Sequence, residues 1–115
     1  MAVAVIDHQR DGELCTVTYR VSANGNASTT ANVIGHVTQF ALNNVTGSGV
    51  DPFTVKLEDT ENNYLLFEEN NKSADETLDS FRNGGGGYCR GPLKLTVTNH
   101  AGSITFNVIV YYTRM

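Results

Sequence analysis

Near the end of the chain, apolar and polar residues alternate strictly in two consecutive stretches, and this pattern constrains the fold more than any other feature. The apolar positions of the first stretch are Leu93, Leu95 and Val97. Those of the second stretch are Ile104, Phe106, Val108 and Val110. A repeat of two residues is typical of a strand with one buried face. Because the residues between the stretches, Asn99, His100, Ala101 and Gly102, favour a turn, the sequence predicts one β-hairpin over residues 91–114.

The second stretch also carries bulky side chains on its other face. Ile109 and Tyr111 occupy positions that Thr105 and Asn107 mark as facing solvent. A strand with apolar residues on both faces either lies in the middle of a sandwich or has its outer face covered by a partner. We therefore expect Ile109 and Tyr111 to be covered by a further layer or by another protein.

The first half of the chain contains two longer predicted strands. Residues 13–22 place Cys15, Val17, Tyr19 and Val21 on one face. They precede Asn24 and Gly25, a strong signal for a tight turn. Residues 31–43 place Val33 and Val37 on one face but Ile34, Phe40 and Leu42 on the other. We interpret Gly35 as a bulge at which the inward face switches.

Residues 68–91 differ in composition from the rest of the chain. The segment is acidic, has few apolar residues, and contains four consecutive glycines from Gly84 to Gly87. Ser73 and Glu76 match a capping box, which predicts a short helix ending near Phe81. With shorter strands at residues 2–6, 53–58 and 64–67, the sequence predicts an all-β fold: a single antiparallel β-sandwich or squashed barrel of about seven strands. We expect one domain over residues 1–115, an arm or edge strand at residues 1–6, and a long loop at residues 68–91.

Composition disfavours several classes of function. The formal net charge is −4, and the eight basic residues are scattered, which does not suit nucleic-acid binding. The longest apolar run, residues 2–6, is too short for a membrane span or a signal peptide, so we expect synthesis and retention in a cytoplasm. In that compartment Cys15 and Cys89 are expected as free thiols, and a disulfide between them is the alternative.

No motif in the sequence predicts catalysis, a cofactor or a metal site. The glycine run is followed by Tyr88, Cys89 and Arg90 rather than by the lysine and hydroxyl residue of a phosphate loop. The histidines, His8, His36 and His100, lie in separate segments and lack partners at metal-ligand spacing. The acidic pair Glu68 and Glu69 lacks the ligand spacing of a calcium loop. We expect a protein without enzymatic activity or cofactor.

Two blocks of the sequence resemble a known family. The first block is Asp51, Pro52 and Phe53, followed at every second position by Val55, Leu57 and Asp59. The second block is Gly91, Pro92 and Leu93, then Leu95, Val97, Asn99, Ala101 and Gly102, ending in the strand at residues 108–111. Over residues 51–112 the chain resembles a family of small virion structural proteins of tailed bacteriophages. The motifs consist of strand and turn residues, so they indicate a fold more directly than an activity.

The resemblance implies a decoration (cement) protein that binds the outside of the phage head and stabilises it. The implied partners are the major capsid protein and further copies of the chain as a homotrimer, without nucleic acid or membrane. The implied location is the capsid surface after synthesis in the bacterial cytoplasm. The residues that we expect to form the interfaces are Ala2, Val3, Ala4, Val5, Ile6, Ile34, Phe40, Ile109 and Tyr111.

Two other functions remain open at this point. A head-to-tail connector or tail component would need the same kind of folded β-domain, but in rings of few copies. A glycan-binding module would need exposed aromatic residues, and the chain has no tryptophan, although Tyr64, Tyr88 and Tyr112 are available. Ordinary burial in the core is the alternative interpretation of every apolar residue assigned above to an interface.

Overall fold

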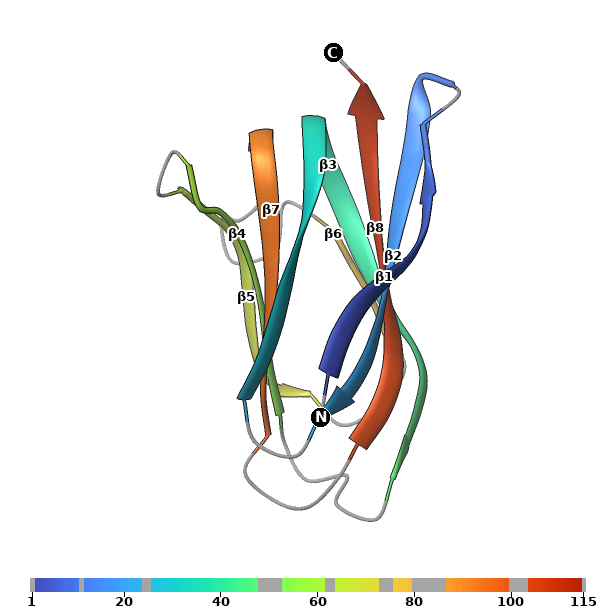
Figure 1. Ribbon diagram of the computed structural model, residues 1–115, viewed down its shortest axis with the longest axis vertical. Coiled ribbons are helices and arrows are strands. Elements are labelled where there is room, and N and C mark those ends of the chain that lie inside the picture. The colour runs from blue at the N-terminus through green and yellow to red at the C-terminus, as the bar shows by residue number, and fades with distance from the viewer. Residues whose placement is uncertain are drawn as a thin grey trace.

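The computed structural model describes residues 2–10, 12–23, 26–47, 53–61, 64–72, 76–79, 87–99 and 104–114. These residues form strands and no helix (Figure 1). The strands are β1 (Ala2–Gln9), β2 (Leu14–Ala23), β3 (Asn26–Gly47), β4 (Phe53–Asp59), β5 (Tyr64–Lys72), β6 (Glu76–Asp79), β7 (Gly87–Asn99) and β8 (Ile104–Arg114). Every pairing between them is antiparallel. The predicted all-β antiparallel class is therefore confirmed.

The long strand β3 belongs to both halves of the sheet. Its first limb, residues 26–37, pairs with β7, and its second limb, residues 39–47, pairs with β8. Residues 35–37 pair with both neighbours. The hydrogen-bonded order is β1-β2-β8-β3-β7-β4-β5, with β6 added beside the second limb of β3. This sheet is not closed into a barrel, and β1 and β5 are the edge strands at the two ends of this order.

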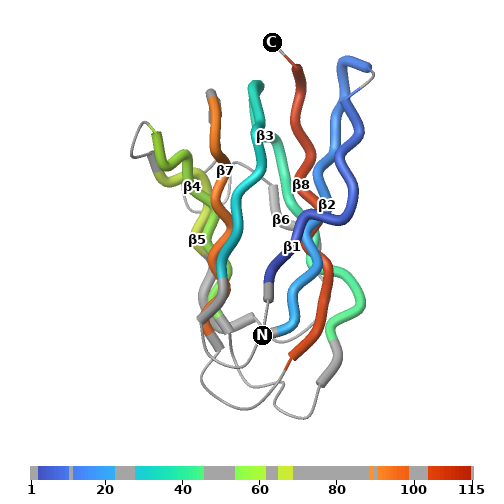
Figure 2. Tube along the Cα trace, in the orientation of Figure 1, coloured from blue at the N-terminus to red at the C-terminus, as the bar shows by residue number. Residues whose placement is uncertain are grey.

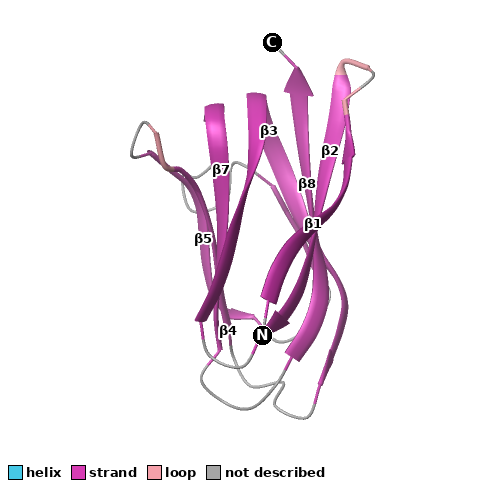
Figure 3. Ribbon diagram, viewed as in Figure 1, coloured by secondary structure: helices cyan, strands magenta, loops and turns pink. Residues whose placement is uncertain are grey.

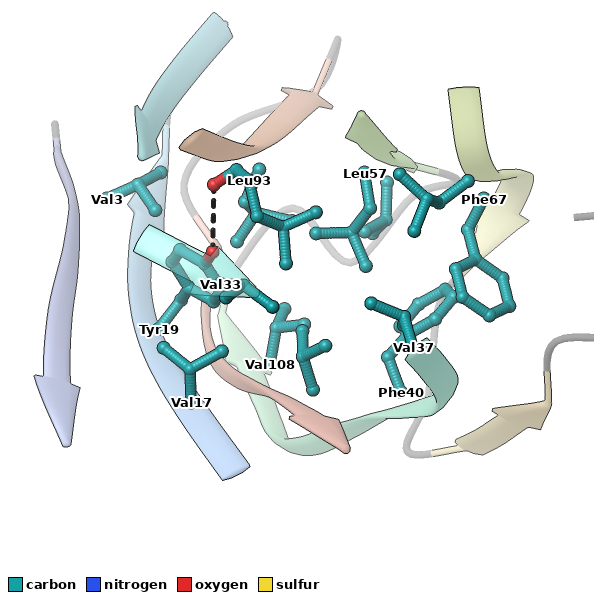
Figure 4. Close-up of a cluster of buried hydrophobic side chains, with 14 of the residues drawn as sticks. Val3, Val17, Tyr19, Val33, Val37, Phe40, Leu57, Phe67, Leu93 and Val108 are labelled. Carbon is teal, nitrogen blue, oxygen red and sulfur yellow. Dashed lines mark hydrogen bonds between the residues drawn. The ribbon is translucent and has the colours of Figure 1, made fainter. Parts of the chain in front are cut away.

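Because β3 bends between its limbs, the sheet folds over into two layers (Figure 2). We call them the β4–β7 layer (β5, β4, β7 and the first limb of β3) and the β2–β8 layer (the second limb, β8, β2 and β1). Strands of both layers contribute to one interior, as Figure 4 shows for Tyr19, Leu57, Leu93 and Val108. The Tyr19 hydroxyl spans the layers and donates a hydrogen bond of 3.0 Å to the Leu93 carbonyl oxygen.

The alternation found in the sequence correctly predicts which side chains are buried. Along β8, Ile104, Phe106, Val108, Val110 and Tyr112 face the interior. The same holds for the alternating apolar residues of β2, β4 and β7, which are Cys15, Val17, Tyr19, Val21, Val55, Leu57, Leu93, Leu95 and Val97. Burying a side chain of this size stabilises the fold by about 1.5 to 3 kcal/mol, so these strands hold the two layers together.

The predicted hairpin of residues 91–114 is wrong. The strands β7 and β8 do not pair with each other, because β7 lies between β3 and β4 while β8 lies between β2 and β3 (Figure 3). Each strand buries its apolar face from a different layer. A period of two residues therefore predicts which face of a strand is buried, but it does not predict which strand pairs with it. The predicted turn residues His100, Ala101 and Gly102 lie outside the described residues.

A β-bulge in β3 switches its inward face, as predicted, but the switch occurs at Thr38 rather than at Gly35. Val37 pairs with Tyr112 and Gln39 with Tyr111, so Thr38 is the extra residue. The Thr38 hydroxyl donates a hydrogen bond of 3.2 Å to the Tyr111 carbonyl oxygen. Val33 and Val37 face the interior before the bulge, and Phe40 faces it after the bulge.

Gly35 has a different role, because β3 passes close to β8 at this residue. A Cβ atom at this position would overlap the carbonyl oxygen of Thr113 and would lie 2.9 Å from Cδ2 of Tyr112. Gly35 pairs with Cys89 of β7 and with Arg114 of β8. The missing side chain therefore allows three backbones to meet where the sheet folds over.

Two further expectations concern local segments. The predicted helix beginning at Ser73 is wrong for residues 76–79, which form β6 and pair with residues 39–42 of β3. Pairing with a distant strand outweighs the local capping signal. Residues 2–6 belong to β1, an edge strand paired with β2 along its length, rather than to a free arm.

Candidate functional site

The residues predicted as an interface divide among separate places in the fold. On β1, Val3 lies in the core, whereas Val5 and Ile6 are 36% and 52% exposed. A register shift between Val5 and Asp7 makes Ile6 the extra residue of a bulge, and two consecutive apolar side chains are exposed at this edge of the sheet. Ala4 is also exposed, and the side chain of Ala2 lies outside the described residues. The edge strand β1 therefore presents a small apolar surface.

Phe40 does not belong to any exposed surface, so its prediction as an interface residue is wrong. The bulge at Thr38 turns the Phe40 ring inward, where it is fully buried. Its ring meets that of Phe67 edge to face, with centroids 4.7 Å apart and planes at 74°. Phe40 therefore contributes to the packing between the layers (Figure 4).

Ile34, Ile109 and Tyr111 lie on outward faces of the sheet. Ile34, on the first limb of β3, is 59% exposed. Ile109 and Tyr111, on β8, are half-buried among the residues with which they pair on β2 and β3. Because Ile34 and Ile109 belong to different layers, the predicted interface residues do not form one continuous patch.

The structure contains a pocket that the sequence does not predict. It has a volume of about 470 Å³, within the range of small-molecule sites. Among the described residues its lining consists of Arg10, Asn32, Ile34, Tyr112 and Arg114. Arg10 follows β1, Asn32 and Ile34 lie on the first limb of β3, and Tyr112 and Arg114 end β8. The pocket thus lies near the bend of β3, between elements that are far apart in the sequence.

Hydrogen bonds fix the position of Arg114 at this pocket. Its Nη1 donates to the Arg10 carbonyl oxygen at 2.7 Å, and its backbone N–H donates to the Glu13 carbonyl oxygen at 2.9 Å. These bonds join the end of β8 to the connection between β1 and β2. Within the described part of the chain, no carboxylate forms an ion pair with the guanidinium of Arg10 or Arg114.

A phenol and an imidazole form the inner part of this site. Tyr112 Oη and His8 Nε2 share a hydrogen bond of 2.6 Å, and their rings meet at 67°. Burial raises the pKa of Tyr112 to about 12, against a lowering effect of the charges on Arg10 and Arg114. Burial and the Arg10 charge lower the pKa of His8 below its usual 6.5. Both rings are therefore predominantly neutral at pH 7, which leaves the guanidinium groups as the charges of the pocket.

The two thiols do not form a reactive centre. Cys15 and Cys89 are free and buried, as expected for reduced thiols. Burial raises the pKa of Cys89 to about 11, and the charge of Asp59 adds to this rise, while a hydrogen bond with Gly91 opposes it. A thiol with such a pKa stays protonated at neutral pH and is a poor nucleophile.

The described residues contain no group of three or more His, Cys, Asp or Glu side chains placed to hold a metal ion. In the same part of the chain there is no helix that could span a bilayer.

The pocket was missed because its residues give no local pattern. Arg10 and Arg114 each stand at the end of a strand, which is the only signal that the sequence offers, and their proximity depends on the order of strands in the sheet.

Comparison with protein families, curated proteins and solved structures finds no match for this chain.

Proposed function

We propose that the protein is a decoration protein of a tailed-bacteriophage head, which binds the outer surface of the capsid and stabilises it. The resemblance over residues 51–112 suggests this class. The structural observation that supports it best is the edge strand β1, on which Val5 and Ile6 face solvent. An edge strand with exposed apolar side chains can pair with another chain and bury those side chains at the same time.

The outer face of β8 supplies the second surface of this proposal. Ile109 and Tyr111 would be covered by further copies of the chain, which we propose to be arranged as a trimer. On a capsid lattice, many modest contacts act together, so that a small interface per copy is sufficient for stable decoration. The major capsid protein would then contact β1 and leave β8 for contacts between copies.

Binding to isolated heads tests this assignment. We expect that Val5→Ser combined with Ile6→Ser weakens binding to expanded heads by roughly 10- to 100-fold, because two apolar side chains no longer become buried. Leu65→Ser is the matched control, since Leu65 is 45% exposed on the opposite edge strand, β5. Substitution is preferable to deletion of residues 1–6, because Val3 lies in the core.

The number of copies in purified particles tests the class of virion protein. A decoration protein is expected in on the order of hundreds of copies, whereas a connector or tail ring has about 6 to 12. Absence from particles, or a copy number typical of a ring, would contradict the proposal. Equal binding of the β1 variant and the Leu65 control would contradict the assigned surface.

A further inference from the structure

We propose that the pocket between Arg10, Asn32, Ile34, Tyr112 and Arg114 binds a carboxylate carried on an apolar stem, such as the C-terminal carboxylate of a peptide ending in an aliphatic residue. This proposal goes beyond the proposed function, because it does not depend on the presence of a capsid. It rests on the convergence of two cations, a buried phenol and an apolar rim in one concave site.

The charge of the pocket calls for an anion. Arg10 and Arg114 both line it, and their positive charges both act on the Tyr112 phenol. Two guanidinium groups brought together without a counterion repel each other, and within the described residues neither has a carboxylate partner. This concentration of positive charge stands in a chain whose net charge is −4. A bound anion would offset the repulsion between the two groups.

The geometry favours hydrogen bonding as well as charge. Arg114 is held by its bond to the Arg10 carbonyl oxygen, which uses one of the five N–H donors of a guanidinium group. The remaining donors can form the paired bonds that a carboxylate accepts. Since the side chain is already ordered, binding costs less conformational entropy than it would at a freely moving surface arginine.

The apolar part of the lining distinguishes a carboxylate on a stem from a small inorganic anion. Both Ile34, which is 59% exposed, and the almost fully buried Tyr112 line this pocket. An aliphatic group next to the carboxylate would cover Ile34 and remove its apolar surface from water. Inorganic phosphate offers the charge but no such group. The volume of about 470 Å³ leaves space for the stem in addition to the carboxylate.

A titration followed by ¹H–¹⁵N NMR tests the proposal. The peptide N-acetyl-Gly-Ala-Leu with a free C-terminal carboxylate is compared with its C-terminal amide, with 4-methylpentanoate and with inorganic phosphate. We expect the free peptide to shift the backbone amide signals of Arg10, Asn32, Ile34 and Arg114, and the amide form to leave them unchanged. Saturation by 4-methylpentanoate at equal concentration would identify a small carboxylic acid as a sufficient ligand, and weaker binding would favour a peptide terminus.

Two variants separate the pocket from general electrostatic attraction. Arg10→Gln removes one guanidinium group but keeps the carbonyl oxygen that accepts from Arg114, so we expect roughly 10-fold weaker binding or more. Arg20→Gln, at an exposed arginine of β2 outside the lining, should not change the affinity. Equal shifts with the amide peptide, tighter binding of phosphate than of either carboxylate, equal effects of the two variants, or no shift at the pocket would each overturn the proposal.

Discussion

The two layers present similar side chains to the interior but different side chains to the outside. On the β4–β7 layer, the outward positions of β4 and of residues 94–98 of β7 are polar or charged, and Lys56 forms an ion pair of 3.9 Å with Glu58. The exposed apolar side chains of this layer, Ile34 and Leu65, lie on β3 and β5. On the β2–β8 layer, the outward face of β8 continues from Thr105 to Ile109 and Tyr111. The alternating apolar residues on the inner faces therefore determine the fold. Apolar residues on an outer face instead indicate a surface that another molecule covers.

The largest expected effect is on the interior that the layers share. Phe40→Ala should lower the free energy of unfolding by about 3 to 5 kcal/mol, because it leaves a cavity beside Phe67. Chemical denaturation at equilibrium measures this change. The matched outer-face change, Ile109→Ala, should cost less than about 1.5 kcal/mol, since Ile109 is only half-buried. If both variants lost a similar free energy of unfolding, the inner and outer faces of the β2–β8 layer would not differ in how strongly they are buried.

The junction between the layers is expected to be almost as sensitive. Gly35→Ala should destabilise the protein by roughly 2 to 4 kcal/mol, because the added Cβ meets backbone atoms of Thr113 that cannot move without disturbing β8. The same substitution at Gly12, where a Cβ would lie 3.9 Å from its nearest neighbour, serves as the control. If thermal unfolding of both variants matched that of the unaltered protein, the close approach of β3 and β8 would be wrong.

A smaller effect on stability is expected at the outer faces, where association is the relevant measurement. Ile109→Ser with Tyr111→Ser should change the free energy of unfolding by about 1 to 2 kcal/mol and should abolish self-association in sedimentation equilibrium. Lys56→Ser with Lys94→Ser, on the opposite layer, should leave association intact. If only the lysine variant lost self-association, the contact surface between copies would lie on the β4–β7 layer instead.

The smallest expected effect is a pH dependence from His8 on β1. Its pKa is lowered in the folded protein, so below pH 6.5 the unfolded chain binds more protons than the folded one. Stability should therefore fall as the pH drops from 6.5 to the folded pKa of His8, and this contribution should be constant above 6.5. His8→Gln should remove that part of the pH profile of unfolding. An unchanged profile would show that the contact between His8 and Tyr112 does not affect stability.

The sequence correctly predicted which face of each strand is buried but not which strands pair, and Leu93 and Val108 illustrate why. Both were correctly predicted to be buried, because side chains alternate with a period of two regardless of what lies beside the strand. Their strands were wrongly paired, since the choice of neighbour depends on how β3 divides its two limbs between them. The capping box at Ser73 failed for a related reason, as a local signal competed with pairing to β3.

The candidate site shows the same limit more strongly. Val5, Ile6 and Ile34 were predicted as interface residues, and the structure leaves their side chains exposed. Arg10 and Arg114 were not singled out, because their separation in the sequence hides a contact that arises only when the end of β8 returns to β1. Phe40 was misassigned because the phase of β3 changes at Thr38, and threonine carries no signal that distinguishes a bulge from a regular strand.

The shared position of β3 also has a consequence for the growing polypeptide. Residues 26–47 have all their described pairing partners within residues 76–114, so they are synthesised before any of those partners exist. At about 5 to 20 residues per second, roughly 3 to 13 s separate the synthesis of residue 47 from that of residue 114. During that interval a long segment rich in β-branched residues has unpaired amide and carbonyl groups, which exposes nascent chains to aggregation until β7 and β8 have been made.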